Sequence, residues 1–208
     1  MVMRFPRLSH VLIAAAVSTA ALLGVQTPAH ADVNPVTRME IVDFAKDMWD
    51  VPLSVLALTG SECTYFASSA WWAGGIEPTS DWEPKSTDPS QLASTRLNPG
   101  PTKAAASADH FVKYAASSGL ATVREVAWSD NTAGGAELGD VIAYDWNDGA
   151  DGVMDHVAVV TGFADGGYPT VTQHSAPRLD RGWSWDVDGE NWIEYTMPGS
   201  KVYLVHLN

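Results

Sequence analysis

The chain has 208 residues, with 12 lysines and arginines against 25 aspartates and glutamates, so its formal net charge is −13 at pH 7. This balance argues against nucleic acid and anionic membranes as partners, because both repel an acidic surface. The length suits one domain with its own hydrophobic core and no appended binding module.

The first 31 residues have the three parts of an export signal. Two arginines precede an apolar run over residues 11–25, and an Ala-His-Ala tripeptide at 29–31 offers the small residues of a signal-peptidase site. The run is shorter than the roughly 20 residues that span a bilayer. We therefore expect cleavage after residue 31, and a secreted or extracellular mature form without a membrane span, made of a single domain over residues 32–208.

Capping residues and apolar residues at helical spacing predict three helices in the first half. Asn34 can cap a helix that has Pro35 at its first position. The expected helices cover residues 35–49, from about 63 to Gly74-Gly75, and 102–118. Residues 76–101 are rich in Pro, Ser, Thr and Asp, which predicts a long surface loop that carries Trp82.

The second half has short apolar runs typical of strands, separated by Gly, Asp and Pro. The expected strands cover residues 122–128, 140–144, 154–163, 170–174 and 202–206. Because the helices come first and the strands follow, the sequence predicts an α+β fold in which N-terminal helices pack on a C-terminal antiparallel sheet.

Cys63 is the only cysteine, and an unpaired thiol in an exported protein calls for a chemical reason. The start of a helix stabilises a thiolate, and a nearby imidazolium does so further. Cys63 is therefore a candidate nucleophile. The alternative interpretation is a small buried hydrophobe on the apolar stripe of its helix.

His156 is the candidate general base, because it opens an apolar strand where a side chain can face a helix terminus. Such chemistry also needs a polar group that orients the imidazole. A hairpin centred on Asp165 would pair His156 directly with His174. A register shift of one residue would instead put Gln173 on the His156 face, because strand side chains alternate. Either residue could be the third group, and His156 could also simply end its strand.

Two further features have a structural and a functional interpretation. Residues 145–155 offer several carboxylates for calcium but lack the full EF-hand spacing, and turn chemistry explains them without an ion. We expect no cofactor, with calcium as the alternative. Trp71 and Trp72 fit a core, whereas Trp82 and the segment 183–185 are expected at the surface, where they could bind glycan or peptide.

Five short segments together resemble a known family. In chain order they are Glu62-Cys63-Thr64-Tyr65-Phe66, Trp72-Ala73-Gly74-Gly75, Leu138-Gly139-Asp140-Val141-Ile142-Ala143-Tyr144-Asp145, Asp155-His156 and Gln173-His174-Ser175. In order and spacing they resemble the putative amidase domain of bacterial papain-like proteins, which is related to the CHAP and NlpC-type cell-wall hydrolases. The resemblance covers nearly all of the chain after the signal. It implies a papain-like fold with Cys63 as nucleophile, His156 as base and His174 as the third group.

Together these features predict a secreted cysteine amidase or peptidase that forms an acyl-enzyme on Cys63. Export and the resemblance point to peptidoglycan peptides as substrate and to the cell wall as the place of action. One alternative is acyl transfer by the same Cys-His pair, in which an amine intercepts the acyl-enzyme. Another is a non-catalytic domain that binds calcium or glycan through its tryptophan-rich loops.

Overall fold

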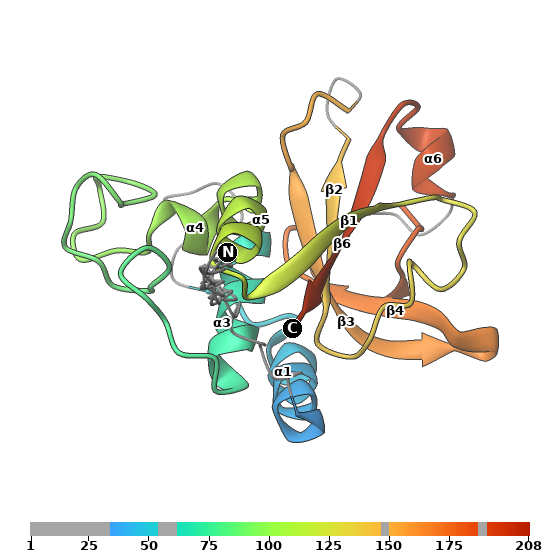
Figure 1. Ribbon diagram of the computed structural model, residues 1–208, viewed down its shortest axis with the longest axis horizontal. Helices are drawn as coiled ribbons and strands as arrows, with labels where there is room; N and C mark the ends of the chain where they lie inside the picture. Colours follow the sequence, from blue (N-terminus) through green and yellow to red (C-terminus); the bar gives the residue numbers. More distant parts are fainter. Residues whose placement is uncertain (1–33, 54–61, 147–149, 187–190) are drawn as a thin grey trace, which may run out of the picture.

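The computed structural model describes residues 34–53, 62–146, 150–186 and 191–208 (Figure 1). The predicted export signal, residues 1–31, lies outside the described residues. The helices are α1 (Pro35–Met48), α3 (Cys63–Ala73), α4 (Lys103–Ala106), α5 (Ala108–Ser117) and α6 (Ile193–Thr196), with a short 3-10 turn, η1 (Asp165–Gly167). The strands are β1 (Ala121–Val126), β2 (Val141–Asp145), β3 (His156–Ala164), β4 (Tyr168–Gln173), β5 (Arg178–Gly182) and β6 (Lys201–Leu207).

The strands form one antiparallel sheet in the order β1-β6-β2-β3-β4-β5. Helices α3, α4 and α5 gather on one side of this sheet, and α6 lies on the other (Figure 1). N-terminal helices and a C-terminal antiparallel sheet confirm the predicted α+β class. None of the helices in the described ranges is long and apolar enough to cross a bilayer.

Helix α1 begins as the sequence predicts and is tied to the sheet by a buried ion pair. The Asn34 side chain accepts hydrogen bonds from the backbone of Val36 (2.9 Å) and Thr37 (3.1 Å), with Pro35 at the first helical position. From the next turn, Arg38 donates to Asp140 at 2.7 Å, and the Asp140 side chain is fully buried. This contact fixes α1 against the start of β2.

Each face of the sheet has its own hydrophobic core. One core packs the apolar sides of α1, α3 and α5 against β2, β3 and β6. The other lies on the opposite face, where Trp183 and Ile193 cover Ile142 and Ala158. The sheet is therefore buried on both sides, which is why β2 and the first part of β3 are apolar at nearly every position.

The structure corrects the expected surface position of two tryptophans. Trp82 has no exposed surface and donates from its indole to Ser68 at 2.9 Å, while its ring packs against Trp71 and Trp72. Trp183 is only 1% exposed. Loop composition predicts where the backbone lies, but a large ring on a loop can still fold over the core.

Most predicted strands are found within about two residues of the expected bounds, but one predicted helix is divided and two short elements, β5 and α6, are additional. The helix expected over 102–118 is interrupted at Ser107, whose extended backbone ends α4 and precedes α5. Strand β5 was not predicted at all, because it is an exposed edge strand whose sequence, Arg-Leu-Asp-Arg-Gly, has no apolar alternation.

Candidate active site

Cys63 is the first residue of α3 and is almost fully buried, at 3% exposure. Glu62 precedes it, and the Glu62 carbonyl accepts the amide of Phe66 at 2.8 Å. The sulfur lies 3.6 Å from the hydroxyl of Thr64. Backbone amides of a first helical turn have no partner within the helix, so this position stabilises negative charge on the sulfur.

His156 is the first residue of β3 and lies opposite Tyr144 of β2. Its imidazole is 3% exposed and stacks on Trp146, with ring centroids 5.1 Å apart and 16° between the planes. The ring of Tyr144 is 5.8 Å away. Aromatic rings therefore enclose the imidazole and shield it from water.

The structure brings Cys63 and His156 together, although they lie on different elements. Burial lowers the pKa of His156, but the charge of Cys63, hydrogen bonds to Cys63 and to Gln173, and the charge of Asp155 raise it, and the net direction is upward. The same attraction stabilises the thiolate, because an ion pair favours the charged form of both partners. This arrangement is a coupled thiol–imidazole pair.

The predicted direct pairing of His156 with His174 is wrong. The hairpin closes around Gly166 with Ala164 opposite Tyr168, and a β-bulge between Val160 and Gly162 then shifts the register by one residue. Continued along the strands, the register places His174 opposite Val157. The extra residue of a bulge reverses the alternation of side chains, so His174 points to the opposite face from His156.

His174 instead contacts residues at the start of α3, the helix that begins with Cys63. Its Nδ1 lies 3.2 Å from the carboxylate of Glu62, and its Nε2 donates to the carbonyl of Met48 at 2.8 Å. The ring stacks on Phe66 at 4.3 Å. His174 therefore links the end of α1, the start of α3 and the end of β4. Its contact at the start of α3 is with Glu62, the residue before Cys63.

Gln173 is the polar residue that reaches His156, as the alternative register predicts. It is 8% exposed, and its amide nitrogen donates to the carbonyl of Ala176 at 3.2 Å, which leaves its oxygen for the imidazole. The interaction with Gln173 is one of those that raise the pKa of His156. A glycine within a strand signals a bulge, and Gly162 was the sequence signal for this register.

The acidic turn before β3 supports the imidazole. Asp145 accepts the backbone amides of Asp151 and Gly152 at 3.2 and 2.9 Å, and Asp155 accepts the amide of Trp146 at 2.9 Å. The Asp155 carboxylate thus holds the backbone of Trp146, whose ring stacks on His156. Residues 147–149 lie outside the described residues, and within the described ranges no cluster of three acidic, histidine or cysteine side chains could hold a metal ion.

A cavity of about 390 Å³ opens beside the start of α3. Its described lining residues are Asp50, Pro52, Glu62, His174, Ser175, Ala176 and Pro177. Glu62, the residue before Cys63, is part of this lining, whereas Cys63 and His156 are not among its described residues.

The fold and the site define a class of protein: an α+β domain with a buried thiol at a helix start and a buried imidazole at a strand start. The family model described as "putative amidase domain" matches residues 37–197, and the chain belongs to this family. The match spans both candidate residues. Searches of curated proteins and of solved structures return no match.

Proposed function

We propose that the protein is a cysteine-dependent amidase in which Cys63 and His156 carry out the reaction. The observation that carries the proposal is the coupled thiol–imidazole pair at the starts of α3 and β3. Membership of the amidase family supports amide bonds as the reacting groups. A thiolate is the form that attacks a carbonyl carbon, and the helix start and the imidazolium both favour it.

The reaction would proceed in two halves. In the first, the Cys63 sulfur bonds to the amide carbonyl carbon, the C–N bond breaks, and His156 gives its proton to the departing amine. In the second, His156 takes a proton from water, the resulting hydroxide bonds to the thioester carbon, and the C–S bond breaks. The acid is released, and the thiolate of Cys63 and the imidazolium of His156 are restored. Backbone amides at the start of α3 can stabilise the oxyanion.

We assign the orienting role to Gln173 rather than to His174. A polar side chain beside the imidazole limits its rotation and favours the tautomer that faces the sulfur. The Gln173 interaction raises the pKa of His156, which supports this assignment. His174 would act less directly, by holding Glu62 and thereby the first turn of α3.

For the substrate, we propose amide bonds of peptidoglycan peptides, outside the cell. The basis is the export signal predicted at residues 1–31 and the resemblance to cell-wall hydrolases. The test is incubation with purified peptidoglycan fragments and analysis of new amino and carboxyl ends by mass spectrometry. Cys63→Ala should form no product, whereas equal product from this variant would refute the proposal. Added amine would reveal acyl transfer as an amide of that amine.

A further inference from the structure

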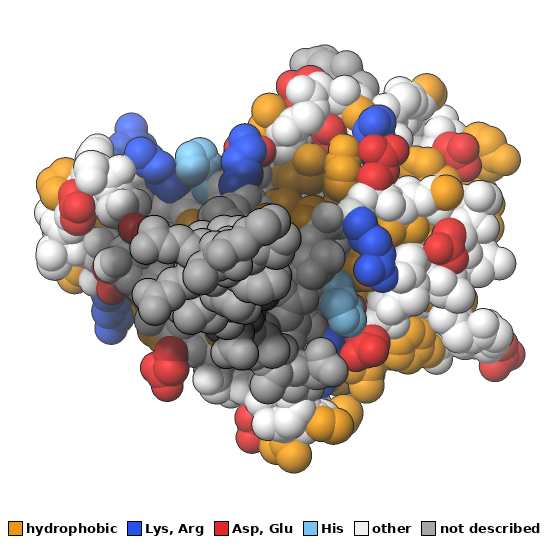
Figure 2. Space-filling view, viewed as in Figure 1, with side chains coloured by type: hydrophobic (Ala, Val, Ile, Leu, Met, Phe, Trp, Pro, Cys, Tyr) orange, Lys and Arg blue, Asp and Glu red, His pale blue; other side chains and the backbone are white. Residues whose placement is uncertain are grey.

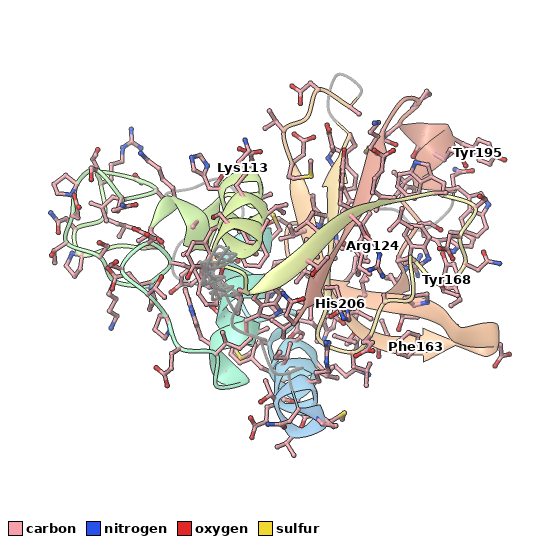
Figure 3. All side chains as sticks on the ribbon, in the orientation of Figure 1. Lys113, Arg124, Phe163, Tyr168, Tyr195 and His206 are labelled. Atoms are coloured by element: carbon pink, nitrogen blue, oxygen red, sulfur yellow. The ribbon has the colours of Figure 1, made fainter. Side chains whose placement is uncertain are left out.

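Exposed aromatic side chains gather at α6, on the face of the sheet opposite α3. Trp192 and Tyr195 expose 42% and 73% of their surface. Figure 2 shows hydrophobic side chains at this edge of the molecule, and Figure 3 shows Tyr195 pointing away from the sheet. Trp128 lies beside them and is half-buried. Single exposed aromatic side chains are common on protein surfaces. A cluster of them with polar residues at its edge is typical of a binding site.

These three rings line a cavity of about 190 Å³ together with three polar residues. The described lining residues are Trp128, Asn131, Ser184, Trp192, Glu194 and Tyr195. The Asn131 amide can donate and accept hydrogen bonds, and the Glu194 carboxylate accepts them. This described lining contains no lysine, arginine or histidine. The cavity therefore offers ring faces and hydrogen-bonding groups without positive charge.

The tryptophan rings are held in place by other tryptophans. Trp128 stacks on the buried Trp183 at 5.6 Å with 3° between the planes, and its indole donates to the carbonyl of Ser200 at 3.1 Å. Trp192 packs on Trp185 at 4.8 Å. A ligand would thus meet an arrangement that already exists, which lowers the entropy cost of binding.

We propose that this cavity binds a neutral saccharide. A sugar ring has an apolar C–H face that packs on an aromatic ring, and hydroxyls that match an amide and a carboxylate. Anions are disfavoured by Glu194 and by the net charge of −13. A quaternary ammonium ion has no N–H to donate to Asn131, so it would use the rings and Glu194. Of these ligands, only a saccharide uses both the rings and the amide.

The proposal goes beyond amide hydrolysis, since none of the described residues of this cavity is Cys63, His156 or Gln173. It is tested with the full chain carrying Cys63→Ala, so that turnover cannot affect the result. Isothermal titration with triacetylchitotriose and with maltotriose should show saturable binding of at least one. Tyr195→Ala and Trp192→Ala should each weaken it about tenfold. The matched control is Phe163→Ala, an aromatic residue 46% exposed on β3, which should bind as the parent does.

Three outcomes would overturn the proposal: no binding of either saccharide at millimolar concentration, unchanged affinity in both aromatic variants, or tighter binding of choline than of either saccharide. Circular dichroism checks folding, and Tyr195→Ala carries the test alone if Trp192→Ala does not fold, because the exposed Tyr195 ring contributes little to packing. None of these outcomes bears on amide hydrolysis, because the parent of every variant lacks the thiol.

Discussion

At the scale of single residues, the candidate site depends on two element starts. Cys63 is the first residue of α3, and His156 is the first residue of β3. Trp146 stacks on the imidazole, and the hydroxyl of Thr64 lies 3.6 Å from the sulfur. Both reacting groups are thereby held in a nearly dry environment, where charge interactions are strong.

The first prediction concerns the thiolate of Cys63. An ordinary cysteine, with a pKa of about 8.5, is only a few per cent thiolate at pH 7. If His156 holds the thiolate, iodoacetamide should alkylate the native protein readily at pH 7, and His156→Ala should slow alkylation at least about tenfold. Mass spectrometry of timed samples across pH measures the rate. A rate indifferent to His156 would point to a buried structural thiol.

The pH dependence of turnover provides a second prediction. The pKa of His156 is raised above the ordinary 6.5, so the imidazolium that protonates the leaving amine persists above that pH. Activity should therefore decline on the alkaline side only above pH 6.5, and Gln173→Ala should move this decline to lower pH, because it removes one interaction that raises the pKa. A profile of kcat/KM against pH gives both limbs. An unmoved alkaline limb would contradict the role of Gln173.

Comparison of Gln173 with His174 provides a third prediction. Gln173→Ala should lower kcat about tenfold to a hundredfold with a smaller loss of stability, because besides the contact with the imidazole it removes a single hydrogen bond, to the carbonyl of Ala176. His174→Ala should lower the unfolding free energy by about 2 kcal/mol or more, because it removes the imidazole that contacts the buried Glu62 carboxylate and the carbonyl of Met48. Kinetics and urea unfolding on both variants distinguish the roles. The reverse pattern would restore His174 as the orienting group.

At the scale of elements, α1 is attached to the sheet through one buried carboxylate. Asp140 accepts from Arg38, from the backbone of Leu207 and from His206, at 2.7, 3.1 and 2.8 Å. His206 lies on β6 near α1 (Figure 3). The carboxylate thus joins the first helix, the start of β2 and the last strand, which are distant in sequence.

The fourth prediction tests this attachment. Arg38→Ala leaves Asp140 buried without its cation, so the unfolding free energy should fall by about 3 to 5 kcal/mol. The control is Lys113→Ala on α5, whose ion pair with Asp109 is exposed and should contribute little. Urea unfolding measures both variants. Similar small losses in the two would mean that Asp140 is stabilised by its other partners alone.

At the scale of the whole molecule, the proposed nucleophile and the proposed saccharide cavity lie on opposite sides of the sheet. The helix side carries Cys63, and the opposite face carries the proposed saccharide cavity at α6. A protein of this charge gains no electrostatic attraction to an acidic cell wall. A saccharide site on the same domain would provide affinity for a glycan that charge does not.

The fifth prediction concerns export. Expressed with its first 31 residues in a bacterium that has signal peptidase, the protein should appear in the medium with Asp32 at its amino end. Intact mass gives the cleavage site. Replacing apolar residues of the run 11–25 by charged ones should keep the uncleaved chain in the cell, and secretion of that variant would refute the signal.

The sequence by itself determined the features that depend on residues close together in the chain. The Asn34 cap, the helix that begins at Cys63 and the apolar strands of the second half each follow from local backbone preferences and alternation. The order of helices and strands determined the α+β class for the same reason. The choice of Cys63 and His156 as candidates also needed only their types and their places at element starts.

Only the tertiary structure decided which side chains meet. A single bulge near Gly162 placed Gln173 rather than His174 on the His156 face, since one extra residue reverses the alternation along a strand. Strand β5 forms because it pairs with β4 at the edge of the sheet. Trp82 is buried because its loop folds back over the core. Each depends on contacts between distant segments, and local preference carries no information about them.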